Sequence, residues 1–321
     1  CYSCKTYDKK QYNENKKGRD TMLEVVNAKL MYGDFTAVHN LSFQVQPGEI
    51  FGLLGTNGAG KTTTFRMIMG LLEPTEGYVK YNGQTVSYDT VDQIGYMIEE
   101  RSLLTKLTVK NLILFYGQLK NVSKEDILKR LDYWLERFKI SEYKDKKIKE
   151  LSKGNQQKIQ FISALINEPT LLVLDEPFSG LDLFNVQLFV DVIREYQQKG
   201  ATIIFSSHQI DHVESFCEQL LVLQKGKVVL EGKIKDIKKE YKKQSIQIKG
   251  QVDPEALKKI QGVYEVIVNQ DQTIVKIEDE KYTQNVFDYV STCKEVTKFE
   301  VEEAPLSEIF IAKVGVAYEE V

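Results

Sequence analysis

A glycine-rich segment of the sequence has the spacing of a phosphate-binding loop. Residues 55–62 read GTNGAGKT and fit the pattern G-x-x-x-x-G-K-[ST]. The glycines allow the backbone to curl so that its N–H groups point inward around phosphate oxygens. Lys61 places a compact charge at the β- and γ-phosphates, and the Thr62 hydroxyl can reach Mg²⁺. An ordinary glycine-rich turn is the alternative interpretation. The candidate nucleotide-binding residues of this segment are Gly55, Thr56, Asn57, Gly58, Ala59, Gly60, Lys61, Thr62 and Thr63.

Two adjacent acids follow a short apolar run. Leu171–Leu174 reads LLVL, and Asp175 and Glu176 come directly after it. A buried parallel strand carries such acids at its carboxyl end, where α/β sheets bind ligands. We expect Asp175 to hold Mg²⁺ and Glu176 to orient or deprotonate an attacking water. Acids after a strand are also common in surface turns, so this prediction depends on the phosphate loop.

Two further polar residues stand near strand ends. His208 follows the predicted strand 201–205, so it could reach a γ-phosphate at the same sheet edge, although a single histidine is more often structural or exposed. Asp182 ends the segment SGLD, which taken alone is an ordinary turn sequence.

Short strands and helices must position these residues. The strand 49–54 precedes the phosphate loop, and a helix that stops near Gly70 follows it. The other predicted elements are two β-rich stretches in 23–46 broken at 32–34, a hairpin at Asn82-Gly83, a mostly helical region 108–167 with a capping box at Ser123, a helix at 186–196, and a hairpin of 220–223 with 227–230.

Composition limits the kind of protein. The 321 residues are 42% hydrophobic and 28% charged, with a net charge of −3, which is typical of a globular chain and excludes collagen, coiled coil and wholesale disorder. No apolar run approaches the length of a membrane span, so any spanning part must come from another chain. Cys1 and Cys4 have C-x-x-C spacing, but without a second pair we interpret residues 1–21 as a disordered leader or tag rather than a zinc site.

The length favours about two domains. We expect a first domain at 22–232, a basic connector at 233–244 and a small α/β domain at 245–321 with strands around Ile246 and Ile274. The lysines of the connector are typical of a solvated helix face, and nucleic-acid binding is the alternative interpretation.

The motifs in this order resemble those of ATP-binding cassette (ABC) transporter subunits. The segment 151–157, LSKGNQQ, is similar to the signature motif of that family and stands upstream of Asp175, as it does there. The resemblance covers about 23–232. It implies an α/β P-loop NTPase with a RecA-like core, an antiparallel β subdomain and a helical subdomain at about 100–167. The C-terminal part, with PLSEIF at 305–310, resembles the accessory domain of sodium-efflux (NatA-like) ATPases, which partner ABC-2-type permeases.

The resemblance also implies roles for single residues. Tyr32 matches the aromatic residue that stacks on adenine. Ser152 and Gly154 match positions that contact the γ-phosphate of the opposite subunit, so that two molecules sandwich two ATP. Three positions depart from the pattern: Lys153 replaces glycine, Asn155 replaces glutamine, and Glu99 replaces the glutamine that senses the metal. The implied set is catalytic Glu176, His208 and Lys61; nucleotide-binding Tyr32, the loop residues, Ser152, Gly154 and Asp182; and metal-binding Thr62, Glu99 and Asp175.

The predicted function is an ATPase subunit that uses ATP and Mg²⁺ to drive a separate polytopic permease for export, by ATP-dependent dimer closure. The resemblance places it in the cytoplasm, on the inner face of the cell membrane, as a homodimer or heterodimer without a nucleic-acid partner. Two alternatives stay open: a soluble ABC ATPase that acts on nucleic acid, and a nucleotide-gated module that does not hydrolyse ATP. Lys153, Asn155 and Glu99 are the reason for the second.

Overall fold

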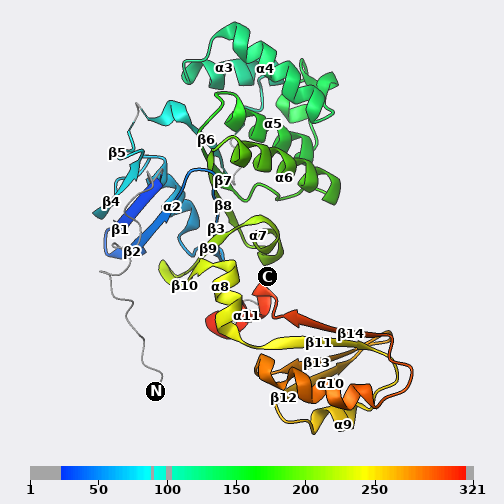
Figure 1. The fold of residues 1–321 in the computed structure, drawn as a ribbon. Coiled ribbons are helices and arrows are strands. Elements are labelled where there is room, and N and C mark those ends of the chain that lie inside the picture. Colours follow the sequence, from blue (N-terminus) through cyan, green and yellow to red (C-terminus); the bar gives the residue numbers. More distant parts are fainter. Residues whose placement is uncertain (1–22, 88–89, 99–102, 316–321) are drawn as a thin grey trace. The chain divides into compact units, whose positions relative to one another are not determined.

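The structure, a computed structural model, describes residues 23–87, 90–98 and 103–315. It divides into two compact units (Figure 1). The first runs up to His208 and includes Leu221–Val228, and the second contains Gln209–Leu220 and the chain from Val229 onward. Within the described residues, no helix is both long and apolar enough to cross a membrane. The prediction for residues 1–21 lies outside the described part of the chain.

A six-stranded sheet carries the phosphate loop and the two acids. Its order is β10-β9-β3-β8-β7-β6, and β3, β8, β7 and β6 run parallel. The strands are β3 (Ile50–Gly55), β6 (Ile94–Met97), β7 (Leu171–Asp175), β8 (Thr202–Ser207), β9 (Gln219–Gln224) and β10 (Lys227–Lys233). Every residue of β3, β7 and β8 is buried, as expected for strands covered on both faces. The predicted buried parallel strand before Asp175 is therefore confirmed.

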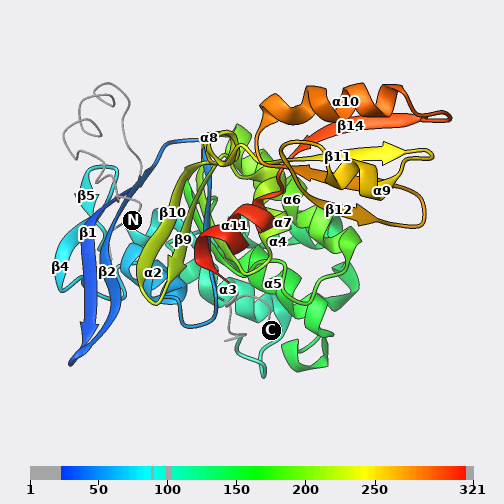
Figure 2. The same ribbon diagram turned by 90° about the horizontal axis from the view of Figure 1, so that it is seen from below.

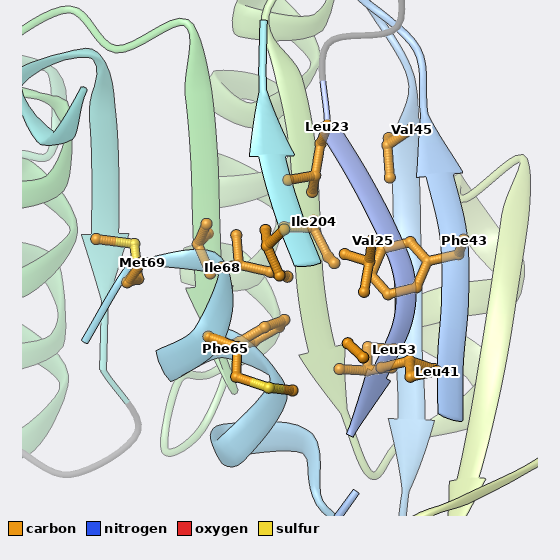
Figure 3. Packing of buried hydrophobic residues seen from close by; sticks show 14 of the residues in the cluster. Leu23, Val25, Leu41, Phe43, Val45, Leu53, Phe65, Ile68, Met69 and Ile204 are labelled. Atoms are coloured by element: carbon orange, nitrogen blue, oxygen red, sulfur yellow. The ribbon is translucent and has the colours of Figure 1, made fainter. Parts of the chain in front are cut away.

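A second, antiparallel sheet has the order β2-β1-β4-β5. Its strands are β1 (Leu23–Tyr32), β2 (Phe35–Val45), β4 (Glu76–Tyr81) and β5 (Gln84–Thr85). The predicted break at 32–34 and the predicted Asn82-Gly83 hairpin are both confirmed. Side chains of this sheet and of α2 (Lys61–Ile68) form one core with the larger sheet (Figure 3), in which the Phe43 and Phe51 rings stack with centroids 4.8 Å apart.

The region 108–167 is helical, as the sequence predicts. It contains α3 (Val109–Leu119), α4 (Lys124–Arg137), the 3₁₀ turns η2 (Ser141–Tyr143) and η3 (Ile148–Glu150), and α5 (Lys153–Leu165). The Ser123 hydroxyl accepts a hydrogen bond from Asp126 N at 3.1 Å and starts α4, which confirms the predicted cap. A further 3₁₀ turn, η1 (Val91–Gln93), precedes β6.

One helix begins earlier than expected. α6 runs Leu183–Gln198 rather than 186–196, because the Asp182 carboxylate accepts a hydrogen bond from Asn185 N at 2.9 Å and caps it. Asp182 is thus a helix cap, which the interpretation of SGLD as an ordinary turn missed.

The second unit contains a four-stranded antiparallel sheet of order β12-β13-β11-β14. The sequence indicated β11 and β13 but missed β12 and β14, whose residues are mostly exposed and lack a clear apolar alternation. Helices α9 and α10 supply Leu257, Val286 and Val290 to the core of this sheet. The elements of the unit are α7 (Ile210–Phe216), α8 (Ile234–Tyr241), β11 (Gln244–Lys249), α9 (Pro254–Lys258), β12 (Val263–Val268), β13 (Thr273–Ile277), η4 (Glu280–Tyr282), α10 (Thr283–Ser291), β14 (Lys298–Glu303) and α11 (Leu306–Val314).

Candidate functional site

The glycine-rich loop forms a cradle between β3 and α2. Gly58 and Gly60 have φ of 77° and 107°, in the left-handed region that favours glycine. A Cβ on Gly60 would lie 2.9 Å from Ala37 O, so a larger residue would also collide with the neighbouring backbone. A pocket of about 280 Å³ lies at this loop, lined by Tyr32, Phe35, Ala37, Thr56, Asn57, Gly58, Ala59, Gly60, Lys61, Thr62 and Thr63.

The loop leads directly into the amino end of α2. Its N-cap is Gly60, which has no side chain to accept a hydrogen bond from the first-turn amides. Those amides and the positive end of the helix can therefore bind an anion such as a phosphate group. The Lys61 Nζ donates to Gly55 O at 2.7 Å and to Thr56 O at 3.4 Å, so its charge points back into the loop. The side chain is only 6% exposed.

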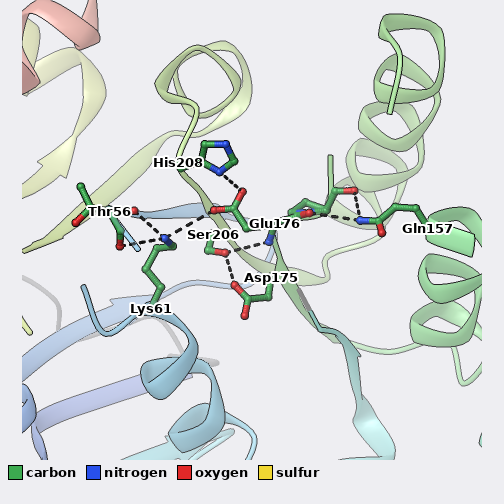
Figure 4. A network of polar contacts seen from close by, with 9 residues as sticks. Thr56, Lys61, Gln157, Asp175, Glu176, Ser206 and His208 are labelled. Carbon is green, nitrogen blue, oxygen red and sulfur yellow. Dashed lines mark hydrogen bonds and ion pairs between the residues drawn. The ribbon is translucent and has the colours of Figure 1, made fainter. Parts of the chain in front are cut away.

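The acids face this cradle from the end of β7 (Figure 4). The Thr62 hydroxyl donates to Asp175 Oδ2 at 3.0 Å, although the two residues are 113 positions apart in the sequence. Ser206, on the neighbouring strand β8, donates to Asp175 Oδ1 at 2.5 Å and accepts from Glu176 N at 3.0 Å. One hydroxyl therefore fixes both acids, a role that nothing in the sequence pattern indicated.

Glu176 lies between the cradle and His208. Its Oε2 is 2.9 Å from His208 Nδ1, and its Oε1 is 3.8 Å from Lys61 Nζ. Oε1 is buried and has no hydrogen-bond partner among the described residues. Burial raises the pKa of the Glu176 carboxyl, and the nearby His208 and Lys61 oppose that shift. A raised pKa at a buried carboxylate beside a phosphate-binding lysine is typical of a general base.

The backbone at Glu176 is held from a third element. Glu176 has φ of 49°, an uncommon value for a residue other than glycine. The Gln157 side chain of α5 donates to Pro177 O at 3.1 Å and to Glu176 O at 3.4 Å. Gln157 is thus a supporting residue of the site, a role that the signature segment 151–157 did not indicate.

Two exposed aromatic residues flank the pocket. Tyr32 ends β1, and Phe35 begins β2 as its cross-strand partner. Their exposed fractions are 47% and 66%, so both rings can contact a ligand. The sequence indicated Tyr32 but missed Phe35, because the strand pairing that brings it to the loop is not visible in the motif.

The signature residues lie elsewhere in the first unit. The Ser152 hydroxyl accepts from Asn155 N at 3.3 Å and caps α5, and Gly154 follows in the first turn. Ser152, Gly154 and Asp182 are not among the residues that line the cradle pocket. The structure therefore brings together the phosphate loop, Tyr32, Asp175, Glu176 and His208. Ser152, Gly154 and Asp182 are not part of this group. Glu99 lies outside the described residues.

Comparison with known proteins agrees with this geometry. The sequence model of the family described as "ABC transporter" matches residues 38–179, and that of the "ATP-binding protein DrrA1-3-like, C-terminal domain" matches 232–314. The uncharacterized ABC transporter ATP-binding protein YhaQ of Bacillus subtilis is 45% identical over 93% of this chain and 100% of its own length. The chain belongs to the ABC transporter ATP-binding proteins.

Other relatives and solved structures support the same assignment. The ABC transporter ATP-binding protein NatA of Bacillus subtilis is 33% identical over 63% of this chain and 83% of NatA. A structure of an ATP-binding subunit of an ABC transporter is 30% identical with a TM-score of 0.65, covering 69% of this chain and 93% of that one. A dimeric post-hydrolysis state of the cassette MJ0796 bound to ADP and Pi is 25% identical with a TM-score of 0.61, covering 66% of this chain and 99% of that one.

These findings confirm the predicted ABC cassette fold and the NatA-like resemblance. The protein is the ATP-binding subunit of an ABC transporter and an ATPase. They support neither the nucleic-acid alternative nor the module without hydrolysis.

Proposed function

We propose that this chain hydrolyses ATP at the cradle with Glu176 as general base and Lys61 and the loop amides as the phosphate-binding groups. The observation that carries the proposal is the meeting of three distant segments. The phosphate loop, the end of β7 and the end of β8 converge through the Thr62–Asp175 contact of 3.0 Å and the His208–Glu176 contact of 2.9 Å. Tyr32 and Phe35 line the same pocket, and we assign their rings to the contact with the base of the nucleotide.

The residues present fit a magnesium ion. Mg²⁺ prefers oxygen ligands, and the Thr62 hydroxyl and the Asp175 carboxylate supply two at adjacent positions. The buried Glu176 Oε1, which lacks a hydrogen-bond partner among the described residues, lies 3.8 Å from Lys61 Nζ of the same cradle. Thr62 and Asp175 would hold the ion, and we assign Glu99 an indirect role through water, as the resemblance implies. When bound, Mg²⁺ neutralises charge on the phosphate oxygens.

In the hydrolysis step, Glu176 orients a water and accepts its proton while the water oxygen bonds to the γ-phosphorus. The bond from that phosphorus to the β–γ bridging oxygen breaks, and ADP leaves. His208 holds Glu176 Oε2, which leaves Oε1 to face the water. Lys61, with the loop amides, stabilises the charge that collects on the phosphate oxygens.

We further propose that two cassettes close over two ATP. Ser152 and Gly154 begin α5 and stay outside the pocket of their own subunit, which is consistent with contact to the nucleotide of a partner. Asp182, the cap of α6, belongs to the same interface. Each γ-phosphate would then be held from both sides, and hydrolysis would remove that link and open the dimer.

The motion would drive export through a polytopic permease at the cytoplasmic face of the membrane. This direction is supported by relatives such as the Nod factor export ATP-binding protein I of Cupriavidus metallidurans, 33% identical over 66% of this chain and 71% of that protein. The linearmycin resistance ATP-binding protein LnrL of Bacillus subtilis is 32% identical over 67% of this chain and 70% of LnrL.

The test is calorimetric titration of the full chain with ATP, in Mg²⁺ and in EDTA, followed by phosphate release. We expect binding in both conditions and turnover only with Mg²⁺. Asp175→Asn should bind ATP in EDTA like the parent and lose the gain that Mg²⁺ provides. Absence of heat with Mg-ATP would overturn the site, and equal Mg²⁺ dependence in Asp175→Asn would remove the metal assignment. Co-expression of the chain with a candidate polytopic permease, followed by co-purification from solubilised membranes, tests the partner.

A further inference from the structure

The catalytic carboxylate stands on a strained piece of backbone. Glu176 is the first residue after β7, and its φ of 49° lies in the left-handed region. A residue other than glycine stays in this region only where surrounding contacts hold it there. On its amide side, Glu176 N donates to the Ser206 hydroxyl at 3.0 Å. The direction of the carboxylate therefore depends also on what holds the carbonyl side of the same residue.

A side chain of α5 holds that carbonyl side, as Figure 4 shows. Gln157 Nε2 donates to Pro177 O at 3.1 Å and to Glu176 O at 3.4 Å. Gln157 is only 2% exposed, so little water reaches these hydrogen bonds. Glu176 O also accepts from Ser179 N at 3.2 Å, but that bond lies within the loop itself. Gln157 thus fixes the loop from a different element.

The first two turns of α5 run along the loop 176–182, which joins β7 to α6. Gln157 contacts the beginning of this loop. A Cβ added to Gly154 would lie 3.8 Å from Gly180 O, an ordinary van der Waals distance, so the first turn of α5 lies beside the middle of the loop. Helix and loop therefore meet at two points, and a displacement of α5 changes the position of the backbone at Glu176.

α5 is itself anchored to the other helices of the first unit. The Phe161 ring of α5 stacks on the Phe189 ring of α6 with centroids 4.3 Å apart, and the two helices can be followed in Figures 1 and 2. Lys158 Nζ donates to Phe138 O, at the carboxyl end of α4, at 3.2 Å. Since both rings are fully buried, α5 has a defined place from which Gln157 reaches the loop.

We propose that Gln157 is a positioning residue for ATP hydrolysis, which fixes the backbone of Glu176 from α5 so that Oε1 can face the attacking water. The same helix begins with Ser152 and Gly154. The segment proposed to contact the nucleotide of a partner is therefore joined, within one subunit, to the base of that subunit's own site. This inference deepens the proposed function and rests on the role given there to Glu176.

The first test compares Gln157→Met with Gln156→Met in the full chain. Methionine is similar to glutamine in length and volume but cannot donate these hydrogen bonds. Gln156 is a matched control, because this adjacent glutamine of α5 also donates to two carbonyls, Leu151 O at 3.0 Å and Ile148 O at 3.2 Å, which lie outside the loop 176–182.

We expect kcat to fall about tenfold in Gln157→Met with the KM for ATP unchanged, less than the roughly 10²-fold cost of a 1 Å misplacement. Gln156→Met should stay within about twofold of the parent in both constants. Parent kcat in a folded Gln157→Met would overturn the inference. An equal fall in Gln156→Met would also overturn it, because the loss would then reflect a general loosening of α5.

The second test adds Glu176→Gln, measured by single turnover at high enzyme concentration. If Gln157 acts through Glu176, Gln157→Met should lower the residual rate further by less than about twofold in that background. A full additional tenfold loss would show that Gln157 acts by another route. Unchanged turnover in Glu176→Gln alone would instead remove the role proposed for Glu176.

A shorter amide keeps the inference testable if Gln157→Met does not fold. Gln157→Asn retains the donor but withdraws it by one methylene, so both hydrogen bonds should lengthen or break. We expect kcat to fall severalfold in this variant, again with the KM for ATP unchanged. Parent kcat in Gln157→Asn would then overturn the inference.

Discussion

Two lysine–glutamate pairs in this protein differ in burial, one lying in the catalytic cradle and the other on the protein surface. In the cradle, Lys61 and Glu176 stand 3.8 Å apart, and both side chains are 6% exposed. On α9, Lys258 and Glu255 stand closer, at 2.7 Å, with side chains 51% and 70% exposed. The nearer pair is the one that water surrounds, so the distance alone does not rank the two interactions.

The two pairs differ in how much hydration each charge loses on folding. Charges that leave water incur a large desolvation cost, and a loose contact of 3.8 Å offsets only part of it. The raised pKa of Glu176 is the sign of that cost. An exposed pair loses little hydration on folding and gains little electrostatic stabilisation. The charges of Lys61 and Glu176 therefore destabilise the nucleotide-free protein, and they serve function when a triphosphate binds.

The largest expected effect comes from Glu176→Gln. The amide cannot accept a proton, so phosphate release should fall by about 10² to 10⁴-fold. ATP binding should persist, and a dimer should accumulate because the γ-phosphate is not removed. Phosphate release and size-exclusion chromatography with ATP measure the two effects. Hydrolysis at the parent rate would show that Glu176 is not the base, and Glu255→Gln serves as the exposed control.

Lys61→Ala should act on binding rather than on turnover alone. Its ammonium is a charge-assisted donor to phosphate, a class of contact that contributes about 1.5–3 kcal/mol, so ATP affinity should fall by about 10 to 10²-fold. A nucleotide titration measures the shift. Lys80→Ala, on strand β4, is the matched control, and an unchanged Kd in Lys61→Ala would remove the phosphate-loop assignment.

The site residues fall into those that local sequence reveals and those that it does not. Lys61 and Asp175 were predictable because each stands within a motif whose neighbours also form its strand or turn. Ser206 and Gln157 were not, since their roles arise from contacts with Asp175 and Glu176 on another element. Phe35 was not, since its role depends on the pairing of β1 with β2. The hydrogen bond from Leu306 N to Glu214 is likewise not visible in the sequence, because the two residues lie 92 positions apart.

Much of the fold was predictable on similar grounds. Continuous apolar runs marked β3 and β7, and turn residues marked the hairpins. β14 was missed because residues such as Glu300 and Glu302 are exposed on an edge strand and show no apolar period. β12 was missed because its sequence, VYEVIV, is apolar without alternation and does not distinguish a strand from a helix.

Ser206→Ala tests a residue that only the structure indicates. Its hydroxyl joins Asp175 to the backbone of Glu176, and its loss removes one hydrogen bond from each of these buried groups, which costs about 1–3 kcal/mol. We expect turnover to fall about tenfold with the two acids less well held. Ser291→Ala, whose hydroxyl bonds to Asp288 O on exposed α10, is the control. Equal kinetics in both variants would contradict the role given to Ser206.

Glu176→Gln should also change the stability of the nucleotide-free protein with pH. Burial raises the folded-state pKa of Glu176 above its unfolded value, so ionisation lowers the stability of the parent as pH rises through the folded pKa. Glutamine does not titrate. The variant should therefore be more stable than the parent at a pH well above the folded-state pKa of Glu176, and the gap should close as the pH falls below the unfolded value. Urea unfolding of both proteins from mildly alkaline to acidic pH measures the difference in free energy of unfolding. A difference that grows toward acidic pH would contradict the prediction.

The smallest effect should come from the exposed pair. Lys258→Ala removes an i,i+3 contact between side chains that are mostly in water, which changes the free energy of unfolding by about 0.5 kcal/mol or less. ATP turnover should stay at the parent value, and the small loss should shrink further in 1 M salt, where exposed charges are screened. Urea unfolding at low and high salt measures this. A loss comparable to that of Ser206→Ala would mean that distance, rather than burial, ranks the charge pairs of this protein.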